Sequence, residues 1–274
     1  MQDIPINGAY PELKLAIEAA VEAGKSIMNI YGREFETRTK SDDSPVTEAD
    51  LKSNEIIRGF LSSTPHAVLS EEDKDDGKRL VRQTVWIVDP LDGTMDFIDG
   101  TGEFTVMIAL VRDKKPIVGV INWPAGDTIF AAQYGKGAFR YSDSTWQRIA
   151  VTEKTEITEC IAVGSRHHPS DMERKIVRGL GIKRLDSFGS SLKIGRICSG
   201  QAEIYIAATD KMKEWDSAAS YCIINEAGGR MTDMLGHDIS YNGRIVHHRD
   251  GILATNGHVH DIIVEEFKRL ISCP

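Results

Sequence analysis

The amino-acid sequence predicts an α/β fold in which helices and strands form stacked layers. Amphipathic helical patterns lie near the N-terminus, and short apolar strand patterns then alternate with helical patterns through both halves of the chain. With 274 residues, of which 41% are hydrophobic, the chain is long enough for one large domain or two packed lobes. We expect an N-terminal α+β lobe over residues 1–145 and a C-terminal α/β lobe over residues 146–274, with a soft boundary near residues 142–148.

Two helices are predicted in the first part of the chain. Apolar residues recur at helical spacing from Pro11 to Tyr31, and Gly32 ends that run. A second helix is expected from Thr47 to Leu61, with acidic residues near its positive N-terminal end.

Strand patterns follow the two helices. Residues 67–70 and 85–88 are short buried-strand candidates that run directly into carboxylates. Residues 105–111, 117–122 and 129–133 predict an antiparallel meander with turns at 113–114 and 126–127. Beyond the soft boundary, helical and strand patterns alternate over residues 161–164, 172–179, 191–199, 202–207 and 217–227.

Composition excludes several classes of function. A formal net charge of −8 argues against binding a nucleic acid polymer, and it means that an acidic protein handling phosphate needs a local cation such as a divalent metal. The four cysteines (Cys160, Cys198, Cys222, Cys273) form no CxxC pair, so neither a zinc cluster nor a disulfide framework is expected. Without a basic–apolar leader or an apolar run of about 20 residues, the sequence predicts a cytoplasmic protein with no membrane span.

The segment 88–94, Val-Asp-Pro-Leu-Asp-Gly-Thr, is the strongest candidate for a functional site. It places Asp89 and Asp92 three residues apart at the end of an apolar strand, while Pro90 fixes φ and Gly93 permits a tight turn. Two acids on a rigid turn repel each other, and a bound divalent cation such as Mg²⁺ compensates for that repulsion. The alternative is a solvated acidic turn that caps a helix, and these two residues alone do not decide between the two.

Three other acidic segments bear on this choice. Ser-Glu-Glu-Asp at 70–73 also follows a short apolar strand, and the alternative for it is an exposed acidic loop. Asp50 lies inside the second helix, where a single acid is usually a surface residue. Asp216, in Glu-Trp-Asp-Ser-Ala-Ala, is expected at an N-cap position, and capping alone would explain it.

Taken together, the four segments resemble the inositol monophosphatase superfamily of lithium-sensitive, magnesium-dependent phosphatases. The order also matches: an Asp in a helix, a Glu pair after a strand, DPxDGT, and WDxAA followed by Glu-Ala-Gly-Gly at 226–229. The resemblance covers nearly the whole chain. It implies a layered α-β-α-β-α sandwich of the inositol monophosphatase and fructose-1,6-bisphosphatase type, with most metal ligands in residues 1–145.

The resemblance also implies a ligand set for two to three Mg²⁺ ions. Glu71, Asp89 and the Leu91 carbonyl would hold the first ion. Asp89, Asp92 and Asp216 would hold the second, and Glu71 would help to place a third, more labile ion.

Two further residues receive catalytic roles from the same resemblance. Thr94, hydrogen-bonded to Asp50, would orient and activate the attacking water. Gly93 and Thr94 would open a helix whose amide N–H groups face the phosphate.

For the substrate, several stretches look most like the 3′(2′),5′-bisphosphate nucleotidases, which convert 3′-phosphoadenosine 5′-phosphate to AMP. The stretches are Leu-Ser-Glu-Glu-Asp at 69–73, Gly-Glu-Phe-Thr-Val at 102–106, Ser-Arg-x-His at 165–168 and Gly-Ser-Ser-Leu-Lys at 189–193. This resemblance implies that Ser190, Lys193 and His168 contact the nucleotide. The alternatives are that Lys193 is a solvated helix residue and that His168 is an ordinary loop histidine.

The sequence departs from the nucleotidases at one important place. Ala207 stands where they commonly carry a phosphate-binding Arg, and Lys211 or Lys213 in the following loop is the candidate substitute. An inositol-1-phosphate or fructose-1,6-bisphosphate phosphatase of broad specificity is therefore the alternative enzyme. A non-catalytic metal- or nucleotide-binding regulator is the alternative of another class. The small-molecule phosphate monoester is the expected partner, and the resemblance leaves open whether the protein is a homodimer or a single chain.

Overall fold

The computed structural model describes residues 3–40, 44–167 and 170–272. Its helices are α1 (Pro11–Ile30), α2 (Glu48–Leu61), α3 (Thr94–Ile98), α4 (Asp171–Gly179), α5 (Leu192–Cys198), α6 (Glu214–Glu226) and α7 (His260–Ser272). Both predicted N-terminal helices are confirmed, and Thr47 caps α2 by accepting a hydrogen bond from the Ala49 amide at 3.1 Å. Among the described residues, no helix has the length and apolar character needed to cross a bilayer.

The larger sheet has seven strands that lie side by side in chain order. They are β3 (Ala67–Ser70), β4 (Thr84–Asp92), β5 (Thr105–Arg112), β6 (Lys115–Trp123), β7 (Thr128–Gln133), β8 (Gly137–Ser142) and β9 (Thr145–Ile149). β3 runs parallel to β4, and every later pair is antiparallel, which confirms the predicted meander. β9 crosses the expected soft boundary, and the division into residues 1–145 and 146–274 stays a prediction.

The second sheet has five strands in the order β11-β10-β12-β14-β13. Their bounds are β10 (Ile161–Ser165), β11 (Arg184–Phe188), β12 (Ile204–Ala207), β13 (Arg230–Thr232) and β14 (Ile252–Thr255). β10 pairs in parallel with β11 and β12, whereas β14 is antiparallel to β12 and β13. A separate small hairpin, β1 (Thr37–Thr39) with β2 (Pro45–Thr47), lies before α2.

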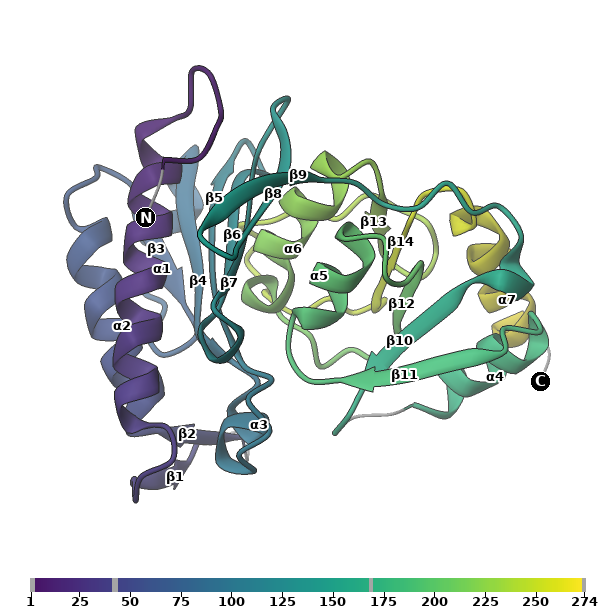
Figure 1. The fold of residues 1–274 in the computed structure, drawn as a ribbon, viewed down its shortest axis with the longest axis horizontal. Helices are drawn as coiled ribbons and strands as arrows, with labels where there is room; N and C mark the ends of the chain where they lie inside the picture. The colour runs from purple at the N-terminus through teal and green to yellow at the C-terminus, as the bar shows by residue number, and fades with distance from the viewer. Residues whose placement is uncertain (1–2, 41–43, 168–169, 273–274) are drawn as a thin grey trace.

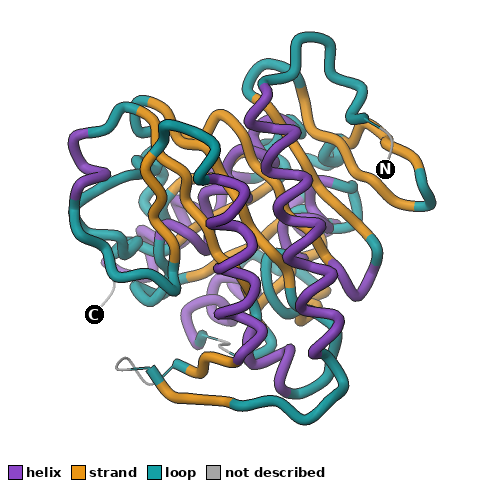
Figure 2. The backbone as a smooth tube through the Cα atoms, turned by 90° about the vertical axis from the view of Figure 1, so that its left-hand side faces the viewer, coloured by secondary structure: helices purple, strands orange, loops and turns teal. Residues whose placement is uncertain are grey.

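The helices and sheets form five layers. Figure 1 shows α1 and α2 on one side, then the seven-stranded sheet, then α5 and α6, then the five-stranded sheet, and finally α4 and α7. Figure 2 shows α1 and α2 lying across the strands that they cover. The predicted α-β-α-β-α sandwich is therefore confirmed.

Burial on both faces explains why β4 reads as a continuous apolar run. Trp86 and Val88 pack with α1 and α2, whereas Val85 and Ile87 on the opposite face join the central core with α5 and α6. A strand that is covered on both faces has no solvent-facing positions at which polar residues would alternate.

α6 packs closely against the seven-stranded sheet at Gly119 in β6. A Cβ at this position would lie 2.5 Å from the Ala219 carbonyl oxygen and 2.9 Å from the Cys222 Cβ, both in α6. The absence of a side chain at Gly119 therefore sets how close α6 comes to the sheet.

Adding a methyl group at this contact should weaken the fold. We expect Gly119→Ala to lower the free energy of unfolding by about 1–3 kcal/mol, because neither the carbonyl nor the helix can move without loss of packing. Gly59→Ala, at an exposed α2 position where a Cβ meets nothing within 4 Å, should instead raise it by about 0.5–1 kcal/mol. Chemical denaturation measures both, and equal effects of the two substitutions would contradict the close packing of α6.

A buried histidine joins α7 to the five-stranded sheet. His260 is 0% exposed, its Nε2 lies 2.8 Å from Thr232 Oγ1, and its Nδ1 lies 3.0 Å from Thr255 Oγ1. Burial, with a smaller contribution from Arg230, lowers the pKa of His260 from 6.5 to about 4.

This histidine should make stability depend on pH. Between pH 6.5 and 4 this histidine is protonated in the unfolded chain but stays neutral in the folded protein. The free energy of unfolding that depends on neutral His260 is therefore fully present above pH 6.5 and is lost as the pH falls. We expect His260→Gln to lose less free energy of unfolding than the wild type between pH 8 and pH 4.5, by up to about 3 kcal/mol. An equal loss of free energy of unfolding in the two proteins between pH 8 and pH 4.5 would contradict the prediction.

Candidate metal centre

The two aspartates of the 88–94 segment lie on a bulge at the end of β4. Asp89 pairs with Met107 of β5 and Asp92 pairs with Thr105, so the β4 side has one more residue between the pairs than β5. Asp89 is 2% exposed and Asp92 is half-buried. A solvated acidic turn is therefore excluded for Asp89.

Three carboxylates from distant segments converge at this bulge. One ligand oxygen from each of Glu71, Asp89 and Asp216 lies within 4.8 Å of the others. β3 and β4 are parallel, which brings Glu71, just after β3, to the same edge of the sheet as Asp89. α6 delivers Asp216 to the same point from the central helical layer.

The predicted N-cap position of Asp216 is wrong. Lys213 is the N-cap of α6 and Asp216 is the third helical residue, where its Oδ2 accepts the Lys213 amide hydrogen bond at 2.7 Å. The helix begins earlier because the Glu214 amide donates to the Val246 carbonyl at 2.8 Å, which holds the first turn in place. The carboxylate therefore lies inside the first turn, with its side chain at the edge of the acidic cluster.

The carboxylates of the trio repel one another in a buried environment. Burial, and next the charge of Glu71, raises the pKa of both Asp89 and Asp216 well above the ordinary aspartate value. Oxygen donors that repel one another at this spacing match what a hard divalent cation requires. The residues present therefore fit a divalent metal.

Lys40 compensates for part of this negative charge. Its Nζ lies 3.0 Å from Glu71 Oε1 and 2.7 Å from Glu72 Oε1. Burial alone would lower the pKa of Lys40, but the charge of Glu71 and the hydrogen bond to Glu72 raise it above its usual value. No local sequence pattern relates Lys40 to a glutamate 31 positions later.

Asp92 is hydrogen-bonded to two residues outside the trio, one on the neighbouring strand β5 and one just before α5. Its Oδ2 accepts hydrogen bonds from the Ser191 amide at 2.6 Å and from Thr105 Oγ1 at 3.3 Å. Burial raises the pKa of Asp92, and the charge of Lys193 opposes that shift. The second ligand set expected from the sequence, which includes Asp92, stays a prediction.

Asp50 and Thr94 are in the contact that the resemblance implied. Thr94 Oγ1 donates to Asp50 Oδ1 at 3.0 Å and lies 3.3 Å from the Leu91 carbonyl oxygen. Asp50 is 1% exposed, and its Oδ2 accepts hydrogen bonds from the amide and hydroxyl of Thr47, each at 2.7 Å. Asp50 is thus a buried residue and not the surface acid that its position in a helix suggests. Burial raises its pKa.

Gly93 is required by the turn before α3. Its φ is +91°, and a Cβ would lie 3.1 Å from both the Glu103 carbonyl oxygen and the Ser190 Cβ. Both the backbone conformation and the space therefore favour glycine. As expected from the sequence, α3 begins directly after this residue.

A cavity of about 680 Å³ opens beside the acidic trio. Its lining includes the acids and Thr94 of the candidate metal centre, and it also includes several residues predicted to bind substrate: Glu71, Asp92, Thr94 and Asp216, and Ser190, Lys193, Ala207, Lys211 and Lys213. The predicted substrate residues Ser190 and Lys193 thus border the same space as the carboxylates. His168 lies outside the described residues.

Lys193 is a buried cation. It is 6% exposed, so a solvated helix residue is wrong. Its Nζ donates to the Ser190 carbonyl at 2.5 Å and to the Phe188 carbonyl at 3.3 Å, and it lies 5.4 Å from the centre of the Tyr205 ring. Its contact with substrate stays a prediction.

A buried polar cluster that the sequence did not reveal anchors the start of α6. Glu214 accepts the amide hydrogen bonds of Asn242 and Gly243, each at 2.7 Å. Arg79, which is 2% exposed, donates to Asn242 Oδ1 at 2.8 Å and to Asp75 Oδ2 at 2.9 Å. The cluster ties the helix that carries Asp216 to the segment that follows Glu71, and its members are too far apart in the chain to form a local motif.

Comparisons with known proteins agree with this geometry. A 3′(2′),5′-bisphosphate nucleotidase CysQ of Salmonella typhimurium is 36% identical over 237 residues, which cover 85% of this chain and 94% of that protein. A histidinol-phosphatase of Chlorobaculum parvum is 36% identical over 263 residues, which cover 90% and 92%. The crystal structure of the extragenic suppressor protein suhB from Bartonella henselae superimposes with a TM-score of 0.81 at 28% identity, covering 95% of this chain and 99% of that one.

The chain also matches the model of the inositol monophosphatase family over residues 10–272. The match spans nearly the whole chain and includes the segments that bring the acidic trio together. The resemblance inferred from the sequence is therefore confirmed: the chain belongs to the inositol monophosphatase family and is a metal-dependent phosphoric monoester hydrolase.

Proposed function

We propose that the protein is a magnesium-dependent 3′(2′),5′-bisphosphate nucleotidase that converts 3′-phosphoadenosine 5′-phosphate to AMP and phosphate. The observation that carries this proposal is the cavity, whose lining combines Glu71 and Asp216 of the acidic trio with Lys193, Lys211 and Lys213. A substrate with two phosphates needs a metal site for one and cations for the other. Similarity to the Salmonella nucleotidase supports the same substrate.

Glu71, Asp89 and Asp216 would hold magnesium, with Asp92 and the Leu91 carbonyl completing a set for two to three ions. When bound, magnesium lowers the pKa of coordinated water, draws charge from the phosphate and stabilises the leaving oxygen. Lys40 lies beside Glu71 and Glu72 and limits the excess negative charge that the phosphate would meet.

Thr94 and Asp50 would orient the attacking water and accept its proton. Thr94 Oγ1 donates its own hydrogen to Asp50, which leaves its lone pairs to accept a hydrogen bond from water. Thr47 holds the other Asp50 oxygen, so only Oδ1 faces Thr94. Because burial raises the pKa of Asp50, its carboxylate is a better proton acceptor than an exposed aspartate.

A histidinol-phosphatase is the second candidate. The histidinol-phosphatase of Chlorobaculum parvum matches over 90% of this chain. The cavity lining also includes Glu173, an acid that suits a leaving group with positive charge. An inositol-phosphate phosphatase of broad specificity remains the alternative within the same family.

Measuring turnover of a panel of four phosphate esters tests which of these substrates the enzyme prefers. We expect kcat/KM for 3′-phosphoadenosine 5′-phosphate to exceed that for histidinol phosphate, inositol 1-phosphate and fructose 1,6-bisphosphate by about tenfold or more, which corresponds to about 1.4 kcal/mol. A tenfold preference for any other ester would overturn the nucleotidase proposal. Phosphate release from none of them in saturating magnesium would favour a non-catalytic binding regulator.

Replacing one carboxylate of the trio tests the metal assignment. Asp89→Asn should abolish phosphatase activity. It should also raise the thermal midpoint of the metal-free protein, because the neutral amide relieves repulsion from Glu71 and Asp216. Magnesium at about 100 times its dissociation constant should stabilise the wild type by about 2.7 kcal/mol and the variant by much less.

Asp143→Asn is the matched control, because Asp143 is an exposed aspartate in the turn between β8 and β9. This control should keep both the activity and the magnesium-induced shift of the wild type. Wild-type turnover by Asp89→Asn would contradict the assignment of Asp89 as a metal ligand.

A further inference from the structure

The cavity has two walls that come from different halves of the chain. Residues 92–96 form one wall next to the acidic trio. The second wall, here called the leaving-group wall, is lined by Ser165, His167 and residues 189–191, 193 and 194, and Arg166 lies in the chain between two of these lining residues. In an ester whose phosphate lies at the acidic trio, this wall would face the part that departs.

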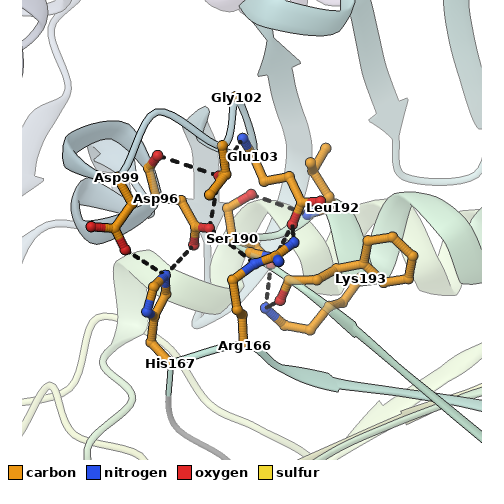
Figure 3. A network of polar contacts seen from close by, with 12 residues as sticks. Asp96, Asp99, Gly102, Glu103, Arg166, His167, Ser190, Leu192 and Lys193 are labelled. Carbon is orange, nitrogen blue, oxygen red and sulfur yellow. Dashed lines mark hydrogen bonds and ion pairs between the residues drawn. The ribbon is translucent and has the colours of Figure 1, made fainter.

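One arginine joins these two walls. Figure 3 shows Arg166, at the end of β10, reaching toward two acids on the side of α3. Its Nη2 lies 2.5 Å from Glu103 Oε2, and its Nε lies 3.3 Å from Asp96 Oδ1. Glu103 Oε2 also accepts the Gly189 amide hydrogen bond at 2.6 Å, so a single carboxylate holds both parts of the leaving-group wall.

The two walls are in close contact at Gly189. A Cβ on Gly189 would lie 2.3 Å from Asp96 Oδ2 and 2.7 Å from the Glu103 carbonyl oxygen. The next residue, Ser190, has a φ of +47°, which a non-glycine residue adopts only when its surroundings hold it there. Contacts from Glu103, Asp92 and Lys193 to residues 188–191 supply that restraint.

Arg166 compensates negative charge on the α3 side of this contact. Asp96 is 2% exposed, and its carboxylate also accepts a hydrogen bond from Thr101 Oγ1 at 2.8 Å. His167 Nε2 lies 3.2 Å from Asp96 Oδ2. Without the guanidinium, Asp96 and Glu103 would stand side by side with reduced compensation, and the leaving-group wall would move away from α3.

We propose that Arg166, through its ion pairs with Glu103 and Asp96, is a positioning residue that determines which leaving groups the cleft accepts. This inference rests on phosphatase activity at this cleft and not on the identity of the ester. The phosphate side of the cleft, including Thr94 and the acidic trio, lies outside the contacts of Arg166. Loss of the pair should therefore weaken binding of the ester but not of inorganic phosphate.

The experiment compares Arg166→Ala and Glu103→Gln, using whichever ester of the panel has the highest kcat/KM. We expect Arg166→Ala to raise KM about tenfold, which corresponds to about 1.4 kcal/mol. The inhibition constant of inorganic phosphate and the magnesium concentration for half-activation should stay within about twofold of wild type. Glu103→Gln should raise KM in the same direction, and the double variant should be no worse than Arg166→Ala because the two residues act as one unit.

These two variants separate positioning from charge. If Arg166 only attracted an anionic ester, removing it would raise KM, whereas removing the negative charge of Glu103 would lower KM. A lowered or unchanged KM in Glu103→Gln would therefore overturn the proposal, as would an equal rise in the inhibition constant of phosphate. Arg166→Lys should be intermediate, because an ammonium cannot pair with both carboxylates as the guanidinium fork does.

Arg230→Ala is the matched control. Arg230 is 42% exposed compared with 38% for Arg166, and its Nη1 lies 2.7 Å from Asp261 Oδ1, away from the cavity lining. Its loss should leave KM unchanged, and thermal unfolding of each variant excludes loss of fold.

A panel preference for histidinol phosphate or inositol 1-phosphate would overturn the nucleotidase proposal and leave the Arg166 comparison valid, whereas hydrolysis of no ester would overturn both.

Discussion

Electrostatic repulsion among Glu71, Asp89 and Asp216 opposes the folded arrangement, because one ligand oxygen from each lies within 4.8 Å of the others. Burial makes the repulsion stronger by removing water that would screen it, which is why the pKa values of Asp89 and Asp216 rise. A chain that keeps three such groups together must hold their segments by contacts made elsewhere. The same strain makes a divalent cation a strong stabiliser of the site.

The layered fold supplies those contacts. Parallel pairing of β3 with β4 brings Glu71 and Asp89 to one edge of the larger sheet. Close packing of α6 on Gly119, together with the buried hydrogen bonds of Glu214, brings Asp216 to the same edge from the central layer. The metal centre therefore depends on contacts in both sheets and in the helices between them, and it cannot be assigned to one segment of the chain.

The two sides of the cleft are held by different means. On the side of the acidic trio, β-sheet pairing, the bulge in β4 and the Asp50–Thr94 hydrogen bond hold the acidic side chains and Thr94 in place. On the leaving-group side, side-chain ion pairs and a left-handed residue at Ser190 hold the wall. Side-chain contacts of this kind change more readily by substitution than a sheet does, so one scaffold can serve esters with different leaving groups.

Local sequence patterns determined much of the fold and part of the site. Apolar spacing predicts α1, α2 and the strands from β3 to β7, because each of these elements is specified by its own residues and by burial of one or both faces. The resemblance to the inositol monophosphatase family implied the converging acids and the Asp50–Thr94 pair. Only the tertiary structure shows that Asp216 lies inside the first turn of α6, that Lys40 neutralises Glu71, that Lys193 is buried, and that Arg166 joins the two walls. Each of these depends on partners distant in the chain, and such long-range contacts leave no periodic pattern in a single sequence.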